Sequence, residues 1–284
     1  MNPDDALQNS HKIGCTIGIL AYNSIETIPR ALESVRDFAE VIVADGGSTD
    51  GTIMYAAREG ARIIEQSQQG KPITDFALER NRLLSAATQP WFFYLDADEA
   101  MSSELRNDIK RITEMTSLDA PRAYRVCYLK SNANISKIYR TFREYYQIRL
   151  TRTDIGSRFE RAVHERIVPP KGTRIGQIEG AWYVPLDDGD LSLAIFADKA
   201  WKRTWVTMSQ WKPKGIIDVA RKMLIDPIVS IGKSLIKIIG TPLKHGTNAI
   251  PLRYELLRIL YALMLAVRSW QALATRFLLR ARLR

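Results

Sequence analysis

Cysteine and histidine are scarce in this sequence. Its 284 residues include two cysteines and three histidines. Cys15 and Cys127 lie far apart and match no metal-ligand spacing, so we expect no disulfide framework and favour a reducing cytosol. A transmembrane helix needs about twenty consecutive apolar residues, and the best run, residues 259–267, is short and lies between Arg258 and Arg268. Residues 1–12 are polar, which argues against a signal peptide.

Acidic residues are scarce too, but only in the C-terminal part of the chain. Of 41 basic and 31 acidic residues, 17 basic and 3 acidic ones lie in residues 199–284, which leaves 24 and 28 in residues 1–198. A body with a net charge of −4 therefore precedes a tail with a net charge of +14. We expect one domain over residues 1–198 and a basic helical region over residues 199–284, whose partner is anionic.

Strand-like and helix-like patterns alternate across the first half of the chain. The predicted strands are residues 16–21, 41–44, 62–64 and 91–95, and the predicted helices are residues 25–38, 52–59, 75–87 and 103–112. Further strands are expected at residues 123–129, 146–151 and 177–184, and a helix at residues 191–209. The alternation predicts an α/β fold with a mostly parallel, mixed sheet and helices on both faces.

Polar clusters follow three of the predicted strands. Tyr22 and Asn23 follow the first, residues 45–50 follow the second, and residues 96–99 follow the aromatic strand 91–95. Ligands of parallel α/β sheets bind beyond the carboxyl ends of the strands, so the three clusters should converge on one edge. This convergence predicts a ligand site there.

Asp96 and Asp98 form the most informative of these clusters. Residues two apart in an extended backbone point the same way. Two carboxylates on one face suit a hard cation, Mg²⁺ or Mn²⁺, which could bridge the oxygens of a diphosphate leaving group. The alternative is a polar strand end that leads into a helix-capping turn.

Asp45 ends the second strand and precedes Gly46 and Gly47. Its carboxylate could accept hydrogen bonds from ribose hydroxyls or a base N–H, and the glycines leave room for a ligand. The alternative is an ordinary strand-to-helix turn, with Ser48 or Asp50 as the helix cap.

Four segments together resemble one enzyme family. They are residues 17–23, residues 41–52 with Asp45 and its glycines, Arg80 with Asn81, and residues 95–99. Their order and spacing resemble the family 2 glycosyltransferases, and more narrowly the bacterial lipopolysaccharide-core β-glucosyltransferases. The resemblance implies a GT-A fold and an inverting transfer from a nucleotide-activated sugar, usually uridine-linked.

The resemblance also assigns donor-site roles, residue by residue. Ala21, Tyr22 and Asn23 would flank the nucleotide base, and Asp45 would contact the uridine. Arg80 would lie near the donor phosphates or sugar; the alternative is a solvated helix residue paired with a neighbouring acid. Asp98 would bind the metal ion, and Asp96 would contact the ribose or the metal.

An inverting transfer needs a base that takes the proton of the acceptor hydroxyl. His164 and Glu165 resemble a Val-His-Glu segment of the same group, which implies Glu165 as the base and His164 as a residue that orients the base or the acceptor. Glu99 and Glu160 are competing candidates. The structural alternative for Glu165 is a polar strand end paired with Arg161 or Arg166.

Two departures from the family bear on the acceptor. The Gln-x-x-Arg-Trp motif of processive synthases is absent, which favours the addition of a single sugar. After Val184 and Pro185 the chain lacks the His-Tyr pair common in the group, so the acceptor is left open between a lipopolysaccharide core and another lipid-linked glycan.

The tail is expected to lie as amphipathic helices on an anionic membrane, at its cytoplasmic face. Trp201, Trp205, Trp211 and Trp270 would suit the headgroup region. The alternative is a helical subdomain packed on the catalytic body. No nucleic-acid partner is expected, because no recognised binding motif is present.

Two other functions stay open at this point. A polyprenyl-phosphate sugar synthase would keep the fold, but its lipid-phosphate acceptor would need no general base. A non-catalytic membrane or nucleic-acid binder would keep only the nucleotide-binding shell, and the intact carboxylates Asp45, Asp96 and Asp98 argue against it.

Overall fold

The computed structural model describes residues 12–117, 119–186, 192–209, 211 and 213–282. The chain divides into two compact units. The sheet unit holds the described residues up to Leu129 and residues 144–184; the helical unit holds residues 130–143 and the described residues from Pro185 onward. The predicted division into residues 1–198 and 199–284 stays a prediction.

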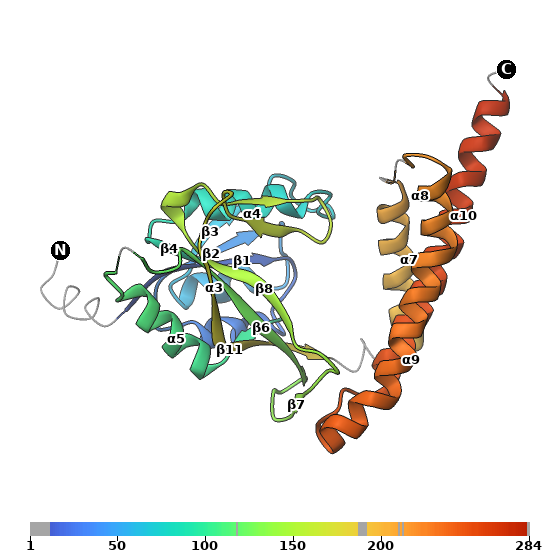
Figure 1. The fold of residues 1–284 in the computed structure, drawn as a ribbon. Coiled ribbons are helices and arrows are strands. Elements are labelled where there is room, and N and C mark those ends of the chain that lie inside the picture. Colours follow the sequence, from blue (N-terminus) through green and yellow to red (C-terminus); the bar gives the residue numbers. More distant parts are fainter. Residues whose placement is uncertain (1–11, 118, 187–191, 210, 212, 283–284) are drawn as a thin grey trace, which may run out of the picture. The chain divides into compact units, whose positions relative to one another are not determined.

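The parallel half of the sheet unit contains four neighbouring strands, in the order β3-β2-β1-β4. They are β1 (Ile13–Ala21), β2 (Phe38–Asp45), β3 (Arg62–Glu65) and β4 (Trp91–Asp96). These strands form one continuous part of the sheet (Figure 1). In the register of the sheet, Ala21 lies beside Asp45 and Leu20 lies beside Asp96. The carboxyl ends of β2, β1 and β4 therefore meet at one edge, as the sequence predicts.

The second half of the sheet is built largely from antiparallel pairs. Its strands are β5 (Ala100–Met101), β6 (Ala123–Asn132), β7 (Ile138–Tyr139), β8 (Tyr145–Arg152) and β11 (Ile175–Leu186). β8 pairs antiparallel with both β4 and β6, and β5 pairs antiparallel with β11. Among the described residues, β9 (Arg158–Glu160) and β10 (Arg166–Val168) form a separate hairpin.

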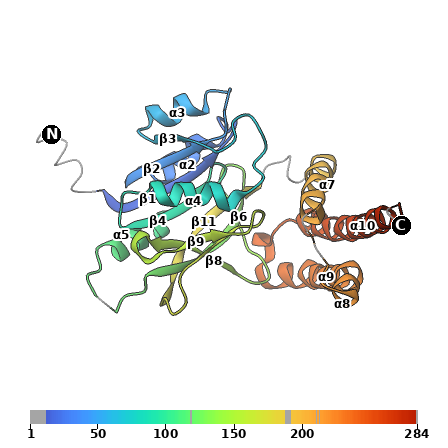
Figure 2. The ribbon, with the colours of Figure 1, turned by 90° about the horizontal axis from the view of Figure 1, so that it is seen from above.

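Side chains alternate between the two faces of the parallel strands. On β4, Phe93 and Leu95 belong to one buried cluster, whereas Phe92 and Tyr94 belong to the other. The first cluster includes residues of α2 (Ile28–Ser34), α3 (Thr52–Arg58) and α5 (Ser103–Thr113), and the second includes α4 (Phe76–Ala86) and the β9–β10 hairpin (Figure 2). Both faces of the sheet are thus covered, and the expected GT-A arrangement of a mixed α/β sheet is confirmed.

The first predicted helix, residues 25–38, is wrong in length. α2 spans only Ile28–Ser34. The carbonyl of Ser24 accepts from the N–H groups of Thr27 and Ile28, so a turn precedes the helix. At the other end Phe38 already begins β2. Local hydrogen bonds at both ends therefore override an apolar spacing that continues past them.

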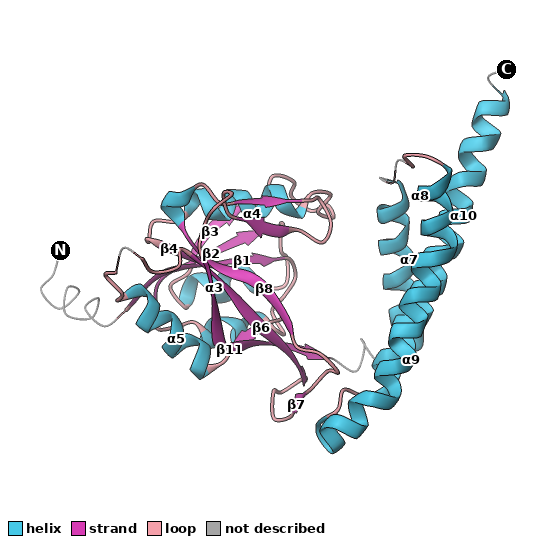
Figure 3. Cartoon of the chain, in the orientation of Figure 1, coloured by secondary structure: helices cyan, strands magenta, loops and turns pink. Residues whose placement is uncertain are grey.

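The helical unit contains α7 (Leu193–Ser209), α8 (Ile216–Ala220), a π-helical turn (Arg221–Ile225), α9 (Asp226–His245) and α10 (Leu252–Arg282) (Figure 3). Between α9 and α10 lies a 3₁₀ turn, Gly246–Asn248. Within α10, the 24 residues Leu252–Thr275 are long and apolar enough to cross a membrane by length and composition alone. From the sequence, only the shorter apolar run 259–267 was considered, so this longer stretch was not predicted.

Candidate active site

Asp45 is buried at the end of β2, where its carboxylate organises the loop that follows. Its Oδ2 accepts from the N–H of Gly47 at 2.7 Å and of Ser48 at 2.9 Å, and its Oδ1 accepts from the Ser48 hydroxyl at 2.5 Å. The positive φ of Gly47, 91°, makes this tight return possible. Asp45 therefore shapes the loop, and contact with a uridine stays a prediction.

The two loops beyond β1 and β2 are tied to each other. Asn23 donates its N–H to the Ser48 hydroxyl at 2.9 Å and accepts at its side chain from the Thr49 N–H at 2.8 Å. Asp50 accepts from the Ile25 N–H at 3.1 Å. Asn23 itself adopts a positive φ of 45°. Two loops far apart in sequence thus form one polar rim at the sheet edge.

Ala21 and Tyr22 lie at the base of this rim. The carbonyl of Ala21 accepts from the Gly46 N–H at 3.0 Å and from the amide of buried Gln66 at 3.2 Å. The ring of Tyr22 is half exposed, so it can stack on a planar ligand from outside the rim. The predicted base-flanking residues are thus brought together beside Asp45.

Arg80, on α4, is 1% exposed and contacts both Asp96 of the predicted metal motif and Glu165, the predicted base. Its guanidinium donates to the Leu95 carbonyl at 3.2 Å and to the Asp96 carboxylate. Its Nε lies 3.5 Å from Glu165 Oε1. The alternative of a solvated helix residue is therefore wrong, because Arg80 is buried and bridges two carboxylates.

Asp96 and Asp98 are placed differently at the end of β4. The Asp96 side chain is 44% exposed even though it binds Arg80, and Asp98 is exposed in the turn that follows. Partial burial raises the pKa of Asp96, but the positive charges of Arg80 and Arg149 outweigh it and hold that pKa below its usual value. Asp96 is therefore an ionised carboxylate at neutral pH.

The carboxylates at the end of β4 decide whether a divalent cation fits this site. No group of three or more Asp, Glu, His or Cys side chains gathers into a metal site within the described residues. Mg²⁺ in nucleotide sites is commonly held by one or two carboxylates together with substrate phosphates. Two exposed carboxylate side chains at a strand end match that pattern, so Asp96 and Asp98 fit a cation whose remaining ligands come from a bound diphosphate.

Glu165 lies in the loop of the β9–β10 hairpin, and its side chain is 17% exposed. α4 holds this hairpin in two places. The Phe76 N–H donates to the Ala162 carbonyl at 2.9 Å, and the Asn81 side chain exchanges two hydrogen bonds with the backbone of Phe159. The same helix that carries Arg80 thus holds Glu165 against it.

His164 is exposed and has a positive φ of 56°. Within the described residues, its imidazole makes no hydrogen bond to Glu165. Its predicted role in orienting the base or the acceptor therefore stays a prediction. The left-handed backbone here costs about 1 kcal/mol for a non-glycine residue and gives the hairpin loop its tight shape.

The competing base candidates are engaged elsewhere. Glu99 is buried, and its carboxylate accepts from Arg149 at 2.8 and 3.2 Å and from the Trp182 indole at 3.0 Å. Burial and the nearby negative charge of Asp96 raise the pKa of Glu99. The positive charge of Arg149 lowers it but does not outweigh them, so the pKa lies above its ordinary value. Glu160 pairs with Arg158 at 2.8 Å on β9. Of the three carboxylates, Glu165 alone contacts Arg80.

The buried pair of Glu99 and Arg149 was not foreseen from the sequence. The Arg149 guanidinium lies 4.1 Å from the ring centre of Tyr94 and 4.2 Å from that of Trp182. Glu99 also accepts from the Asp96 N–H at 3.0 Å, so the pair fixes the backbone of the predicted metal motif. Arg149 lies among other polar residues of the strand pattern 145–152, which gives no sign that its charge is buried.

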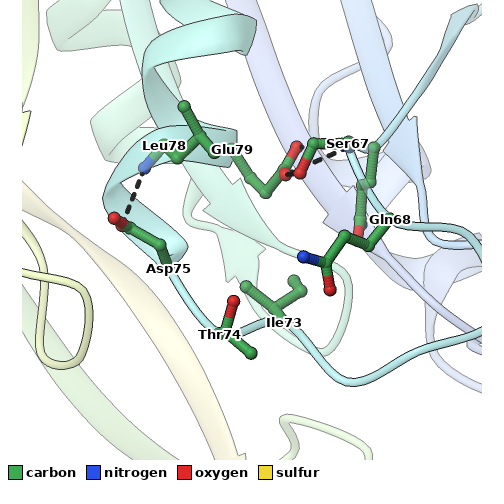
Figure 4. A pocket seen from close by; sticks show the side chains of 8 residues that line it. Ser67, Gln68, Ile73, Thr74, Asp75, Leu78 and Glu79 are labelled. Carbon is green, nitrogen blue, oxygen red and sulfur yellow. Dashed lines mark hydrogen bonds between the residues drawn. The ribbon is translucent and has the colours of Figure 1, made fainter.

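A small hollow lies between the segment after β3 and the start of α4 (Figure 4). Glu79 accepts from Ser67 on one side of it, and Asp75 accepts from the Leu78 N–H at 3.0 Å on the other. Its cavity volume of about 30 Å³ is enough for water but not for a nucleotide. The hollow thus does not compete with the strand-end site for a donor.

Part of this chain is similar to curated glycosyltransferases. Residues of this chain are 34% identical over 108 positions to the SPbeta prophage-derived glycosyltransferase SunS of Bacillus subtilis (strain 168), covering 37% of this chain and 25% of SunS. They are 32% identical over 120 positions to an uncharacterised glycosyltransferase of Rickettsia felis, covering 42% of this chain and 41% of that protein. The chain thus matches less than half the length of these curated relatives.

Among solved structures, S. aureus TarS 1-349 in complex with UDP-GlcNAc is 15% identical and has a TM-score of 0.41, with 90% of this chain and 91% of TarS 1-349 covered. The family model of glycosyl transferase family 2 matches residues 16–165, which is more than half of the 284 residues and includes every segment of the site described above. The chain belongs to glycosyl transferase family 2.

Proposed function

We propose that this protein transfers a single sugar, with inversion, from a uridine-diphosphate sugar to a hydroxyl group of a lipid-linked glycan. The observation that carries the proposal is the position of Arg80, which joins Asp96 of the predicted metal motif to Glu165, the candidate base. Because one buried arginine pairs with both carboxylates, the donor side of the site and the candidate base lie close together.

In this mechanism Glu165 takes the proton of the acceptor hydroxyl while that oxygen attacks the anomeric carbon of the sugar. The bond between that carbon and the diphosphate oxygen breaks on the opposite side, and uridine diphosphate leaves. Arg80 keeps Glu165 beside the donor and contributes positive charge near the developing negative charge. Mg²⁺ or Mn²⁺, held by Asp98 and Asp96, would neutralise the leaving diphosphate.

The rim of Ala21, Tyr22, Asn23 and Asp45 is proposed to hold the nucleoside. Tyr22 offers an exposed ring to the base. Asp45 has one lone-pair direction left beyond its three loop contacts, so it can accept one further hydrogen bond from the base or the ribose.

The acceptor is proposed to be a lipopolysaccharide core or a related lipid-linked glycan at the cytoplasmic face of the membrane. The resemblance in residues 17–99 favours this acceptor class, and the net charge of +14 in residues 199–284 fits a site of action beside anionic lipids.

A panel of nucleotide sugars tests the donor half of the proposal. Thermal unfolding of the purified protein is followed with each nucleotide sugar, with and without Mn²⁺. We expect a uridine-diphosphate sugar to raise the unfolding temperature only when Mn²⁺ is present, and Asp98→Ala to abolish that dependence. A metal-independent shift that survives Asp98→Ala would contradict the metal role.

A further inference from the structure

Helix α9 has its polarity reversed relative to a helix on the surface of a soluble protein. The residues it buries are Pro227 and three polar ones, Ser234, Lys237 and Thr241. The residues it exposes on the other side are large and apolar, each between 51% and 83% exposed: Ile228, Leu235, Ile236, Ile239 and Leu243. A soluble amphipathic helix places its apolar stripe toward the core, and α9 does the opposite.

The spacing shows that these exposed side chains form one continuous stripe. Ile228, Leu235, Ile239 and Leu243 are separated by seven, four and four residues, which returns to the same side of an α-helix each time. The stripe therefore runs the full length of α9 and covers about four turns of helix.

α10 has a second exposed apolar stripe. Leu252, Leu256, Leu263, Val267 and Trp270 are each about half exposed and recur at helical spacing. Glu255 and Ser269, on a different side of α10, are buried. Leu257 and Ala262 of α10 are buried as well, so α10 buries apolar and polar side chains alike, whereas α9 buries only Pro227 and polar side chains.

Basic residues lie beside the α9 stripe. Lys233 and Lys244 are exposed and eleven residues apart, which places both on one side of the helix, next to the apolar stripe. Residues 199–284 as a whole carry a net charge of +14. An apolar stripe with a lysine border matches a lipid surface whose headgroups are anionic.

We propose that α9 lies in the interface of an anionic membrane, with the stripe of Ile228, Leu235, Ile236, Ile239 and Leu243 inserted among the lipid chains and Lys233 and Lys244 at the headgroups. This inference is independent of the proposed sugar transfer, because it rests only on the exposure and charge of the helical unit. A second copy of the chain fits the stripe less well, because two such faces would bring their lysines together.

The test is co-sedimentation of the full-length protein with phosphatidylcholine vesicles, with and without phosphatidylglycerol. We expect strong binding only when phosphatidylglycerol is present. Ile228→Glu combined with Ile239→Glu should weaken this binding at least about tenfold, because two inserted side chains are lost to water. Lys233→Glu combined with Lys244→Glu should weaken it by a similar factor, and only on the anionic vesicles.

The control on α9 is Ser230→Glu, which adds one acidic side chain to the same helix at an exposed position. Nine residues, or two and a half turns, separate Ser230 from Ile239, so it lies on the opposite side of α9. Met54→Glu repeats the apolar-to-acid change at an exposed position of the sheet unit. Both variants should bind vesicles like the unaltered protein.

Circular dichroism and thermal unfolding establish that each variant is folded before binding is compared. Unchanged vesicle binding by folded Ile228→Glu/Ile239→Glu would overturn the proposal and assign attachment to α10. Equal binding to neutral and anionic vesicles would also overturn it. So would a dimer, detected by light scattering, that the double variant dissociates without any loss of vesicle binding.

Discussion

Arg80 offers the sharpest perturbation of the site. Arg80→Met keeps a long unbranched side chain in a position that is 1% exposed, but it removes the donors to Leu95 and Asp96 and the ion pair with Glu165. Loss of one preorganised charged donor at a reacting centre lowers kcat by about 10²–10³-fold. We expect a fall of that size in turnover of a uridine-diphosphate sugar.

The cost in stability is smaller than the burial of Arg80 suggests. Asp96 is 44% exposed, so water replaces part of the lost interaction. We expect Arg80→Met to lower the unfolding free energy by about 2 kcal/mol, which lowers the unfolding temperature by about 4–8 °C. Activity should therefore be compared at a temperature where both proteins are folded.

Arg80→Lys separates charge from geometry. A lysine keeps the positive charge but lacks the planar fork that reaches Asp96 and Glu165 together. We expect its stability to lie near that of the unaltered protein and its turnover to stay low. The assay is release of uridine diphosphate under saturating donor. Turnover by folded Arg80→Lys within about twofold of the unaltered protein would refute the bridging role of Arg80.

Two further predictions concern Asp45 and Glu40. Asp45→Ala leaves the N–H groups of its loop without their acceptor, so it should lower the unfolding free energy by about 1–3 kcal/mol even without nucleotide; urea unfolding measures this, and an unchanged value would make Asp45 a ligand contact only. Burial raises the pKa of Glu40, but hydrogen bonds from Thr16, Thr88 and Arg62 outweigh it and hold that pKa below the ordinary value of a glutamate. The stability that Glu40 contributes is therefore fully present at pH values above the ordinary pKa of a glutamate, and it is lost as the pH falls through the lower pKa of the folded state. Glu40→Gln should thus reduce the difference in unfolding free energy between neutral and acidic pH, and identical pH dependences of the two proteins would contradict this.

The carboxyl edge of the sheet could be predicted because its residues follow strands. Tyr22, Asp45 and Asp96 each come directly after an apolar run, and parallel strands bring such ends together. Strand direction in the second half could not be predicted, because an alternating pattern is the same for parallel and antiparallel pairs. α2 was overestimated because apolar spacing continues through Val35, where the chain has already left the helix.

Partners across the site could not be predicted from the sequence. Arg80 and Glu165 are 85 positions apart, and their contact depends on the β9–β10 hairpin lying on α4. Arg149 lies in a strand pattern that gives no sign of a buried charge, and its partner Glu99 was considered as a base instead. The apolar stripe of α9 is legible as periodicity, but only the structure shows that it faces outward.

The most direct test of the account is the requirement for Glu165 and a divalent cation in one assay. Release of uridine diphosphate from a uridine-diphosphate sugar is measured with a lipid extract of bacterial membranes as acceptor, with Mn²⁺ or with a chelator. We expect release to need Mn²⁺ and to fall by about 10²–10⁴-fold in folded Glu165→Gln. Full release by Glu165→Gln would contradict it and favour a lipid-phosphate acceptor that needs no base.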